Sequence, residues 1–127
     1  MELKEEQTFN FDGFSANQLI TSIDEKYYEC KRDKISRYDM WWGMWSKALN
    51  TCCHSKMNED IRFKYVFFYW VGISQLLELY HKGRLHALGK KRKLRAELEE
   101  LKRIILTNEV ETPINVPEIA KVFNENN

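Results

Sequence analysis

Proline and glycine are scarce in this sequence, which has two prolines and five glycines in 127 residues. These two residue types mark most tight turns, so their scarcity excludes an architecture of many short strands. The chain instead has room for a few long elements. Hydrophobic residues make up 43% and charged residues 31%, a composition typical of one folded domain with a single core.

Long apolar runs are also missing. The longest, YVFFYWV at 65–71, is far shorter than the roughly 20 residues of a transmembrane helix, so we expect no membrane span. The three cysteines are an odd number, and the acidic, polar start MELKEEQ does not have the pattern of a secretory signal. These features predict an intracellular, cytoplasmic protein in a reducing setting.

Motifs of catalysis and of metal binding are absent as well. No phosphate-cradling glycine loop or Gly-x-Ser-x-Gly occurs. Cys52, Cys53 and His54 are adjacent, which is not the spacing of zinc ligand pairs. Glu78 and His81 form a single Glu-x-x-His, whereas di-iron bundles use two together with further glutamates. We expect no metal, no cofactor and no enzymatic activity, and small buried thiols at the cysteines.

Helical periodicity is the main positive signal. Apolar residues recur at helical spacing in four segments, and Ser15 with Gln18 has the pattern of a capping box at the start of the first. The sequence therefore predicts an all-α fold, a compact bundle of four main helices. They are expected at about 16–34, 37–54, 61–82 and 84–106.

The third segment, 61–82, carries two patterns at once. Ile61, Phe63, Tyr65 and Phe67 alternate with charged residues, as in a strand. The segment also has a helical stripe, and it runs without a turn signal for longer than a normal strand. We predict a helix, which is apolar on nearly every side and should be central. Gly72 is expected to allow the close approach of a neighbouring helix.

The N-terminal segment, 1–14, is expected to be an extended arm or a short strand. Phe9, Phe11 and Phe14 nearly alternate in QTFNFDGF, as in a strand or a docked extended segment. The simpler interpretation is an ordered segment whose phenylalanines cover the core. The alternative is a hydrophobic arm that reaches a second subunit.

The C-terminal segment, 112–127, is expected to form an extension with a short helix that has Pro117 at its first position. The predicted domain organisation is therefore an arm at 1–14, a helical bundle at 15–111 and this extension.

Three tryptophans lie close together in YDMWWGMWSKAL, residues 38–49. Trp41 and Trp45 share a helix face, while Trp42 is rotated from Trp41 by roughly 100°. One face cannot hold all three, so some are core and the remainder are exposed or packed in a second interface. Tryptophan is enriched among interface hot spots. Trp41, Trp42 and Trp45 are therefore a candidate protein-binding surface, and Gly43 between them suggests a close contact or a bend.

Positive charge is concentrated in one segment, although the net charge is only +1. Seven basic residues and no acid lie between Lys82 and Arg95, which leaves 13 basic residues against 19 acids elsewhere. Further along the same helix, glutamates four residues away can pair with Lys93, Arg95 and Arg103. The unpaired cluster is then Lys82, Arg84, Lys90, Lys91 and Arg92, a footprint for nucleic acid or an acidic partner, or a solvated basic face.

A leucine seam follows the basic run, with apolar residues spaced four, three and four apart at Leu94, Leu98, Leu101 and Ile105. A basic region before such a seam resembles the order in basic-zipper proteins. The seam covers only about two heptads, too short for an independent coiled coil. Packing of this leucine face on the aromatic third helix explains it more simply.

The leading function predicted from these features is non-enzymatic binding of another protein, as a regulator, inhibitor or assembly factor. The alternative is nucleic-acid binding through the basic segment 82–95. A homodimer could form through Trp42 or through the leucine seam.

Overall fold

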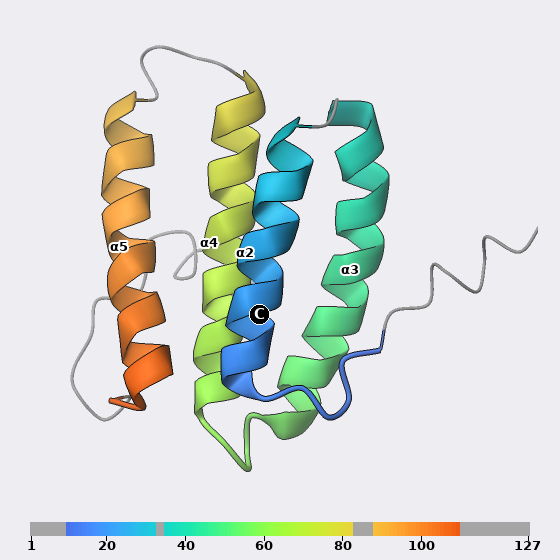
Figure 1. Ribbon diagram of the computed structural model, residues 1–127, viewed down its shortest axis with the longest axis vertical. Coiled ribbons are helices and arrows are strands. Elements are labelled where there is room, and N and C mark those ends of the chain that lie inside the picture. Colours follow the sequence, from blue (N-terminus) through green and yellow to red (C-terminus); the bar gives the residue numbers. More distant parts are fainter. Residues whose placement is uncertain (1–9, 33–34, 83–87, 110–127) are drawn as a thin grey trace, which may run out of the picture.

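The computed structural model describes residues 10–32, 35–82 and 88–109, with the side chains of all of these except 35–41, 82 and 88. These residues form helices α2 (Ala16–Arg32), α3 (Ile35–Lys56), α4 (Arg62–Lys82) and α5 (Leu88–Thr107) (Figure 1). The all-α prediction is confirmed, and no strand occurs in the described part of the chain. The predicted C-terminal helix lies outside the described residues.

Helix α4 is the centre of the fold, because it packs against α2, α3 and α5 (Figure 1). Its residues 66–70 are all buried, although successive residues on a helix point in different directions. A helix that is apolar on all sides must be covered on all sides. The strand alternative for this segment is therefore excluded, and its predicted central position is confirmed.

The helix starts show how local sequence sets the boundaries. The backbone N–H of Ser15 donates to Gln18 Oε1 at 2.7 Å, and the N–H of Gln18 donates to Ser15 Oγ at 3.1 Å. This is the reciprocal capping box expected before α2. At the start of α4, Asp60 accepts the N–H of Arg62 at 3.0 Å. The Arg62 guanidinium also reaches the carbonyl oxygen of Ile105 at 3.4 Å, which joins α4 to the end of α5.

Close contact between α4 and α5 depends on Gly72. A Cβ atom at this position would lie 2.5 Å from Leu98 Cδ2, so only glycine lets α5 approach this far. The expectation for Gly72 is confirmed. A Cβ atom at Gly43, by contrast, would meet none of the described atoms within 4 Å, which goes against the close contact and leaves the bend as the other alternative. The leucine seam is buried within the chain rather than exposed for a second copy: Leu94, Leu98, Leu101 and Ile105.

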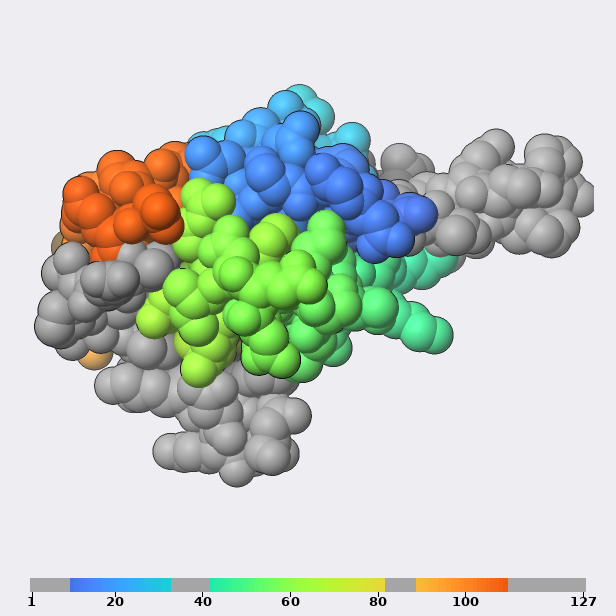
Figure 2. All heavy atoms as spheres, turned by 90° about the horizontal axis from the view of Figure 1, so that it is seen from below, coloured from blue at the N-terminus to red at the C-terminus, as the bar shows by residue number. Residues whose placement is uncertain are grey.

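The described part of the N-terminal arm covers the core of its own chain. The buried Phe11 ring meets the Trp45 ring edge-on with the centroids 5.0 Å apart, and Phe14 packs on Phe11 at 5.4 Å. Seen from below in Figure 2, this dark blue segment lies against the green atoms of the α3–α4 end of the bundle. These contacts agree with the simpler interpretation of the arm, whereas Phe9 lies outside the described residues.

Candidate anion-binding site

All four described helices have one end at the same side of the bundle. Helices α2 and α4 end there, and α3 and α5 begin there, at the top of Figure 1. The described side chains that they contribute include five cations and two exposed tyrosines. We call this set the basic surface: Tyr28, Lys31, Arg32, Tyr80, Lys90, Lys91 and Arg92.

Tyr80 connects the helices within the basic surface. The Lys31 ammonium of α2 lies 4.7 Å from the centre of the Tyr80 ring, and the Lys91 ammonium of α5 lies 5.9 Å from it. The Tyr80 side chain is still 42% exposed, and Tyr28 is 63% exposed. Cations and accessible aromatic rings are therefore interleaved on this surface.

The helix dipole separates these cations into two groups. Lys31 and Arg32 lie in the last turn of α2, where the negative end of the helix dipole favours positive charge. Lys90 and Lys91 lie in the first turn of α5, at the positive end, and no acid accompanies them. Each unfavourable placement costs about 0.3–1 kcal/mol. Folding stability explains the first group but not the second, whereas an anion at this end would be attracted by the cations and by the positive end of the α5 dipole.

The basic surface contains three of the five cations predicted from the sequence, Lys90, Lys91 and Arg92. Lys82 is the last residue of α4 and so lies at the same end, although its side chain is not among those described. Arg84 lies outside the described residues. Sequence reasoning missed the other members of the surface because they come from α2 and the end of α4: Tyr28, Lys31, Arg32 and Tyr80. The run YYECKR was the signal that could have found three of them.

The charge pairs expected along α5 are not formed. Arg103 binds Glu100 at 2.8 Å and Glu109 at 3.0 Å instead of Glu99. Arg95 and Glu99 form no ion pair with any residue that the structure describes. Both residues line a cavity between the helices and are also exposed to solvent. Arg95 therefore joins the cations without an acidic partner.

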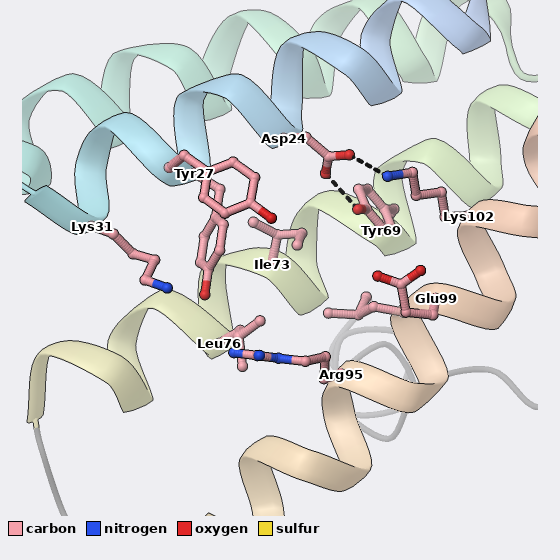
Figure 3. A pocket seen from close by; sticks show the side chains of 11 residues that line it. Asp24, Tyr27, Lys31, Tyr69, Ile73, Leu76, Arg95, Glu99 and Lys102 are labelled. Carbon is pink, nitrogen blue, oxygen red and sulfur yellow. Dashed lines mark hydrogen bonds and ion pairs between the residues drawn. The ribbon is translucent and has the colours of Figure 1, made fainter.

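This cavity, of about 170 Å³, lies between α2, α4 and α5. Figure 3 shows Lys31 entering from α2 and Arg95 from α5, with the α4 side chains Tyr69, Ile73 and Leu76 between them. At one side, Asp24 accepts a hydrogen bond from the Tyr69 hydroxyl at 2.6 Å and pairs with Lys102 at 2.6 Å. This hydrogen bond with Asp24 raises the pKa of Lys102. Burial first, and then Asp24, raise the pKa of Tyr69.

Tyr27 lines the same cavity and is buried, with 6% of its surface exposed. No described residue accepts a hydrogen bond from its hydroxyl, and Arg95 is the only described donor near it. Burial raises the pKa of Tyr27, and the nearby Arg95 guanidinium opposes the rise only in part. The hydroxyl is therefore protonated, and because a guanidinium can only donate, Arg95 cannot accept this proton.

Two of the three tryptophans of α3 lie in the core. Trp42 and Trp45 are both buried, and both contact Trp70 of α4, at ring distances of 4.1 and 5.3 Å. The Trp42 indole N–H donates to Ser74 Oγ at 2.6 Å. Trp42 and Trp45 lie on the same side of α3, because residues three apart share a helix face. Both are core residues here, and the side chain of Trp41 is not described.

The cysteines are buried, as expected from the sequence. Burial raises the pKa of the Cys53 thiol to about 12, which leaves it protonated and a poor nucleophile at neutral pH. His54 lies 2.9 Å from the carbonyl oxygen of Asn50, and His81 lies 3.1 Å from that of Cys30. Within residues 10–32, 35–82 and 88–109, no group of three or more His, Cys, Asp or Glu side chains could hold a metal ion.

Among the described helices, none has the length and apolar character needed to cross a membrane. No protein-family model, curated protein or solved structure matches the chain. Its class is therefore defined by its own fold, an all-α bundle with a cationic end.

Proposed function

We propose that this chain is a non-enzymatic binding protein that takes single-stranded nucleic acid on its basic surface. The observation that carries the proposal is the placement of Lys90 and Lys91 at the positive end of α5. These cations weaken the fold at that point, and local conflicts of this kind are expected where a residue serves binding rather than stability. A phosphate backbone is the partner that would remove the conflict.

The exposed tyrosines favour a single strand over a duplex. Unpaired bases stack on aromatic rings, at about 1–3 kcal/mol per base, while the backbone phosphates follow neighbouring cations. Tyr28 and Tyr80 offer exposed rings beside Lys31 and Lys91. Bases in a duplex cannot reach such rings, so a surface that only held duplex phosphates would not need them.

A protein partner is the leading expectation from the sequence, and neither of the surfaces predicted for it is exposed among the described side chains. Trp42 and Trp45 are buried against α4, and the leucine seam is buried against the same chain. The basic surface is complementary to an acidic protein in charge alone. Its exposed rings beside the cations make nucleic acid the better match.

The test is the binding of a fluorescent oligothymidylate, followed by anisotropy over a series of salt concentrations. We expect the logarithm of affinity to fall linearly with the logarithm of salt concentration, with a slope of about −0.7 for each phosphate neutralised. An oligomer in duplex form should bind more weakly than the single strand. Replacing Lys90, Lys91 and Arg92 by glutamate should abolish binding.

A matched control changes Lys47, Lys56 and Lys64 to glutamate, which alters the net charge by the same amount away from the basic surface. This control should retain most of the affinity. The proposal fails if no oligonucleotide binds at low salt, or if both triple variants lose binding equally. Capture of an acidic protein that survives nuclease treatment, without oligonucleotide binding, would indicate the protein-binding alternative instead.

A further inference from the structure

We propose that the cavity between α2, α4 and α5 binds one phosphate group, with the Tyr27 hydroxyl and the Arg95 guanidinium as its donors. The cavity measures about 170 Å³, below the roughly 300–1,000 Å³ of sites for drug-sized ligands. It is large enough for one small oxyanion with a few waters, since each water takes up about 30 Å³. This inference does not depend on the basic surface binding a nucleic-acid strand.

The Tyr27 hydroxyl is the observation that points to a ligand. The residue is buried and lines the cavity, and no described residue accepts the proton of its hydroxyl, since the nearby Arg95 guanidinium can only donate to the oxygen. A buried polar group without a full set of partners destabilises the fold, and nearly all such groups in proteins have a partner. An anion in the cavity would accept the tyrosine proton and remove this cost.

Two cations converge on the same space. Arg95 reaches in from α5 toward Leu76, and Lys31 approaches from α2 (Figure 3). Lys31 lies 5.4 Å from the ring centre of Tyr27 and 4.7 Å from that of Tyr80, so its ammonium is held at the cavity edge. Neither cation forms an ion pair with a described residue.

The charges around the cavity favour an anion. The α2 side contributes Asp24 and Lys31, and the α5 side contributes Arg95, Glu99 and Lys102. Asp24 and Lys102 neutralise each other at 2.6 Å. The remaining groups are two cations and one carboxylate, together with the neutral hydroxyls of Tyr27, Tyr28 and Tyr69, so the cavity has an excess of one positive charge.

The arrangement of donors suits a tetrahedral oxyanion. A hydroxyl from α2 and a guanidinium from α5 approach from different elements rather than in one plane. A carboxylate accepts hydrogen bonds close to its own plane, whereas phosphate presents acceptor oxygens in several directions. The guanidinium fork can in addition bind two phosphate oxygens at once.

The test titrates the full chain with inorganic phosphate at constant pH and ionic strength, with chloride as the compensating salt, and measures heat by calorimetry. The informative variant is Tyr27→Phe, which removes one hydroxyl whose proton no described residue accepts. This variant should fold with unchanged or slightly higher stability in chloride, because an unsatisfied group is lost. Its affinity for phosphate should fall at least about tenfold, since hydrogen bonds to charged groups are the stronger ones.

Arg95→Gln should weaken phosphate binding as well, and Arg103→Gln is its matched control. Arg103 lies on the same helix but binds Glu100 and Glu109 at the protein surface, so its loss should leave the phosphate affinity unchanged. The proposal is overturned if phosphate gives no more heat than chloride, or if Tyr27→Phe binds phosphate as the parent chain does. It is also overturned if Tyr27→Phe destabilises the chain in chloride, which would mean that the hydroxyl already has a partner.

A second arm identifies the source of the phosphate. An oligothymidylate is added during the phosphate titration, and its affinity is measured for the Tyr27→Phe variant. Competition together with weakened oligonucleotide binding would assign the cavity to a phosphodiester of a bound strand. Phosphate binding without competition would assign it to a free phosphate or a monoester. The Lys90, Lys91 and Arg92 triple variant should still bind inorganic phosphate, so failure of the basic surface and failure of the cavity can be told apart.

Discussion

Two buried tyrosines of one cavity differ in whether the hydroxyl has an acceptor. Tyr69 donates to Asp24 at 2.6 Å, whereas no described residue accepts the proton of the Tyr27 hydroxyl. We predict that Tyr69→Phe lowers the free energy of unfolding by about 1–3 kcal/mol, because a hydrogen bond to a carboxylate is lost and Asp24 keeps only Lys102. Urea unfolding followed by circular dichroism measures the change.

The control for this substitution is Tyr65→Phe on the same helix. Tyr65 is half-buried, and its hydroxyl forms no hydrogen bond with a described residue. Its loss should change the free energy of unfolding by less than about 0.5 kcal/mol. Equal effects at Tyr65 and Tyr69 would contradict the assigned role of Asp24.

Cys53 gives the fold a dependence on alkaline pH. Burial raises the pKa of its thiol from 9.0 to about 12. Between these values the unfolded chain has lost the thiol proton and the folded chain has kept it, so the unfolded state binds fewer protons. The free energy of unfolding therefore falls as pH rises above 9, by up to about 1.4 kcal/mol for each pH unit.

The measurement is urea unfolding under reducing conditions at pH 7, 8, 9 and 10. Cys53→Ala should be less stable at every pH because it leaves a cavity in the core. Its decline above pH 9 should be shallower than that of the parent chain. Parallel curves for the two proteins would show that Cys53 does not contribute to the decline.

Single residues also mark the limit of what the sequence could predict. The burial of Leu94, Leu98 and Leu101 follows from helical spacing and was expected. The position of Trp42 was not, because three tryptophans within five residues offer more than one register for the helix. Which tryptophans face the core depends on Trp70 and Ser74, which lie about 30 positions away in the sequence. Trp70 stacks on the Trp42 ring, and Ser74 accepts a hydrogen bond from the Trp42 indole N–H.

At the level of elements, the contact of α4 with α5 is set by Gly72. A methyl group there would lie 2.5 Å from the buried Leu98 side chain. We predict that Gly72→Ala is destabilising by about 1–2 kcal/mol, since overpacking costs about 1–3 kcal/mol and the gain in helix propensity returns up to about 1. Thermal unfolding measures the difference.

Gly89 of α5 is the matched control, because it is exposed and a methyl group there meets nothing within 4 Å. Gly89→Ala should therefore stabilise the chain by about 0.5–1 kcal/mol. Combining Gly72→Ala with Leu98→Ala should cost less than the sum of the two single changes, since the smaller residue 98 leaves space for the methyl group. If the two changes in the free energy of unfolding were strictly additive, this would contradict a close contact between residues 72 and 98.

The elements themselves could be predicted well, since helices were expected close to where they occur. The capping signals of Ser15 and Asp60 are local, and they fix the starts of α2 and α4 without reference to the rest of the chain. The candidate site could be predicted only in part. Lys31, Tyr80 and Lys91 lie together only because three helices pack against one another. The periodicity of a single segment does not predict which helix ends come together.

At the scale of the whole molecule, the basic surface exchanges stability for the ability to attract an anion. Lys90 lies at the positive end of α5 and Arg32 at the negative end of α2, on the same surface. Changing either to glutamate lowers the positive charge of the surface equally, but it acts on helix dipoles of opposite sense. We predict that Lys90→Glu raises the free energy of unfolding by about 0.5–2 kcal/mol at low salt, while Arg32→Glu does not raise it.

Comparing Lys90→Glu with Arg32→Glu isolates the effect of the helix dipole on stability, because both variants relieve the repulsion among the cations equally. Urea unfolding at low and at high salt measures this effect, and the difference in stability between the variants should shrink as salt screens the charges.

Both variants should bind oligothymidylate more weakly than the parent chain, because each replaces a cation of the basic surface. Lys90→Glu would then be the more stable protein and the poorer binder, which is the combination expected if Lys90 serves a nucleic-acid partner rather than the fold. A Lys90→Glu variant that is less stable than the parent would instead show that this cation supports the fold, and would remove the main argument for the proposed function.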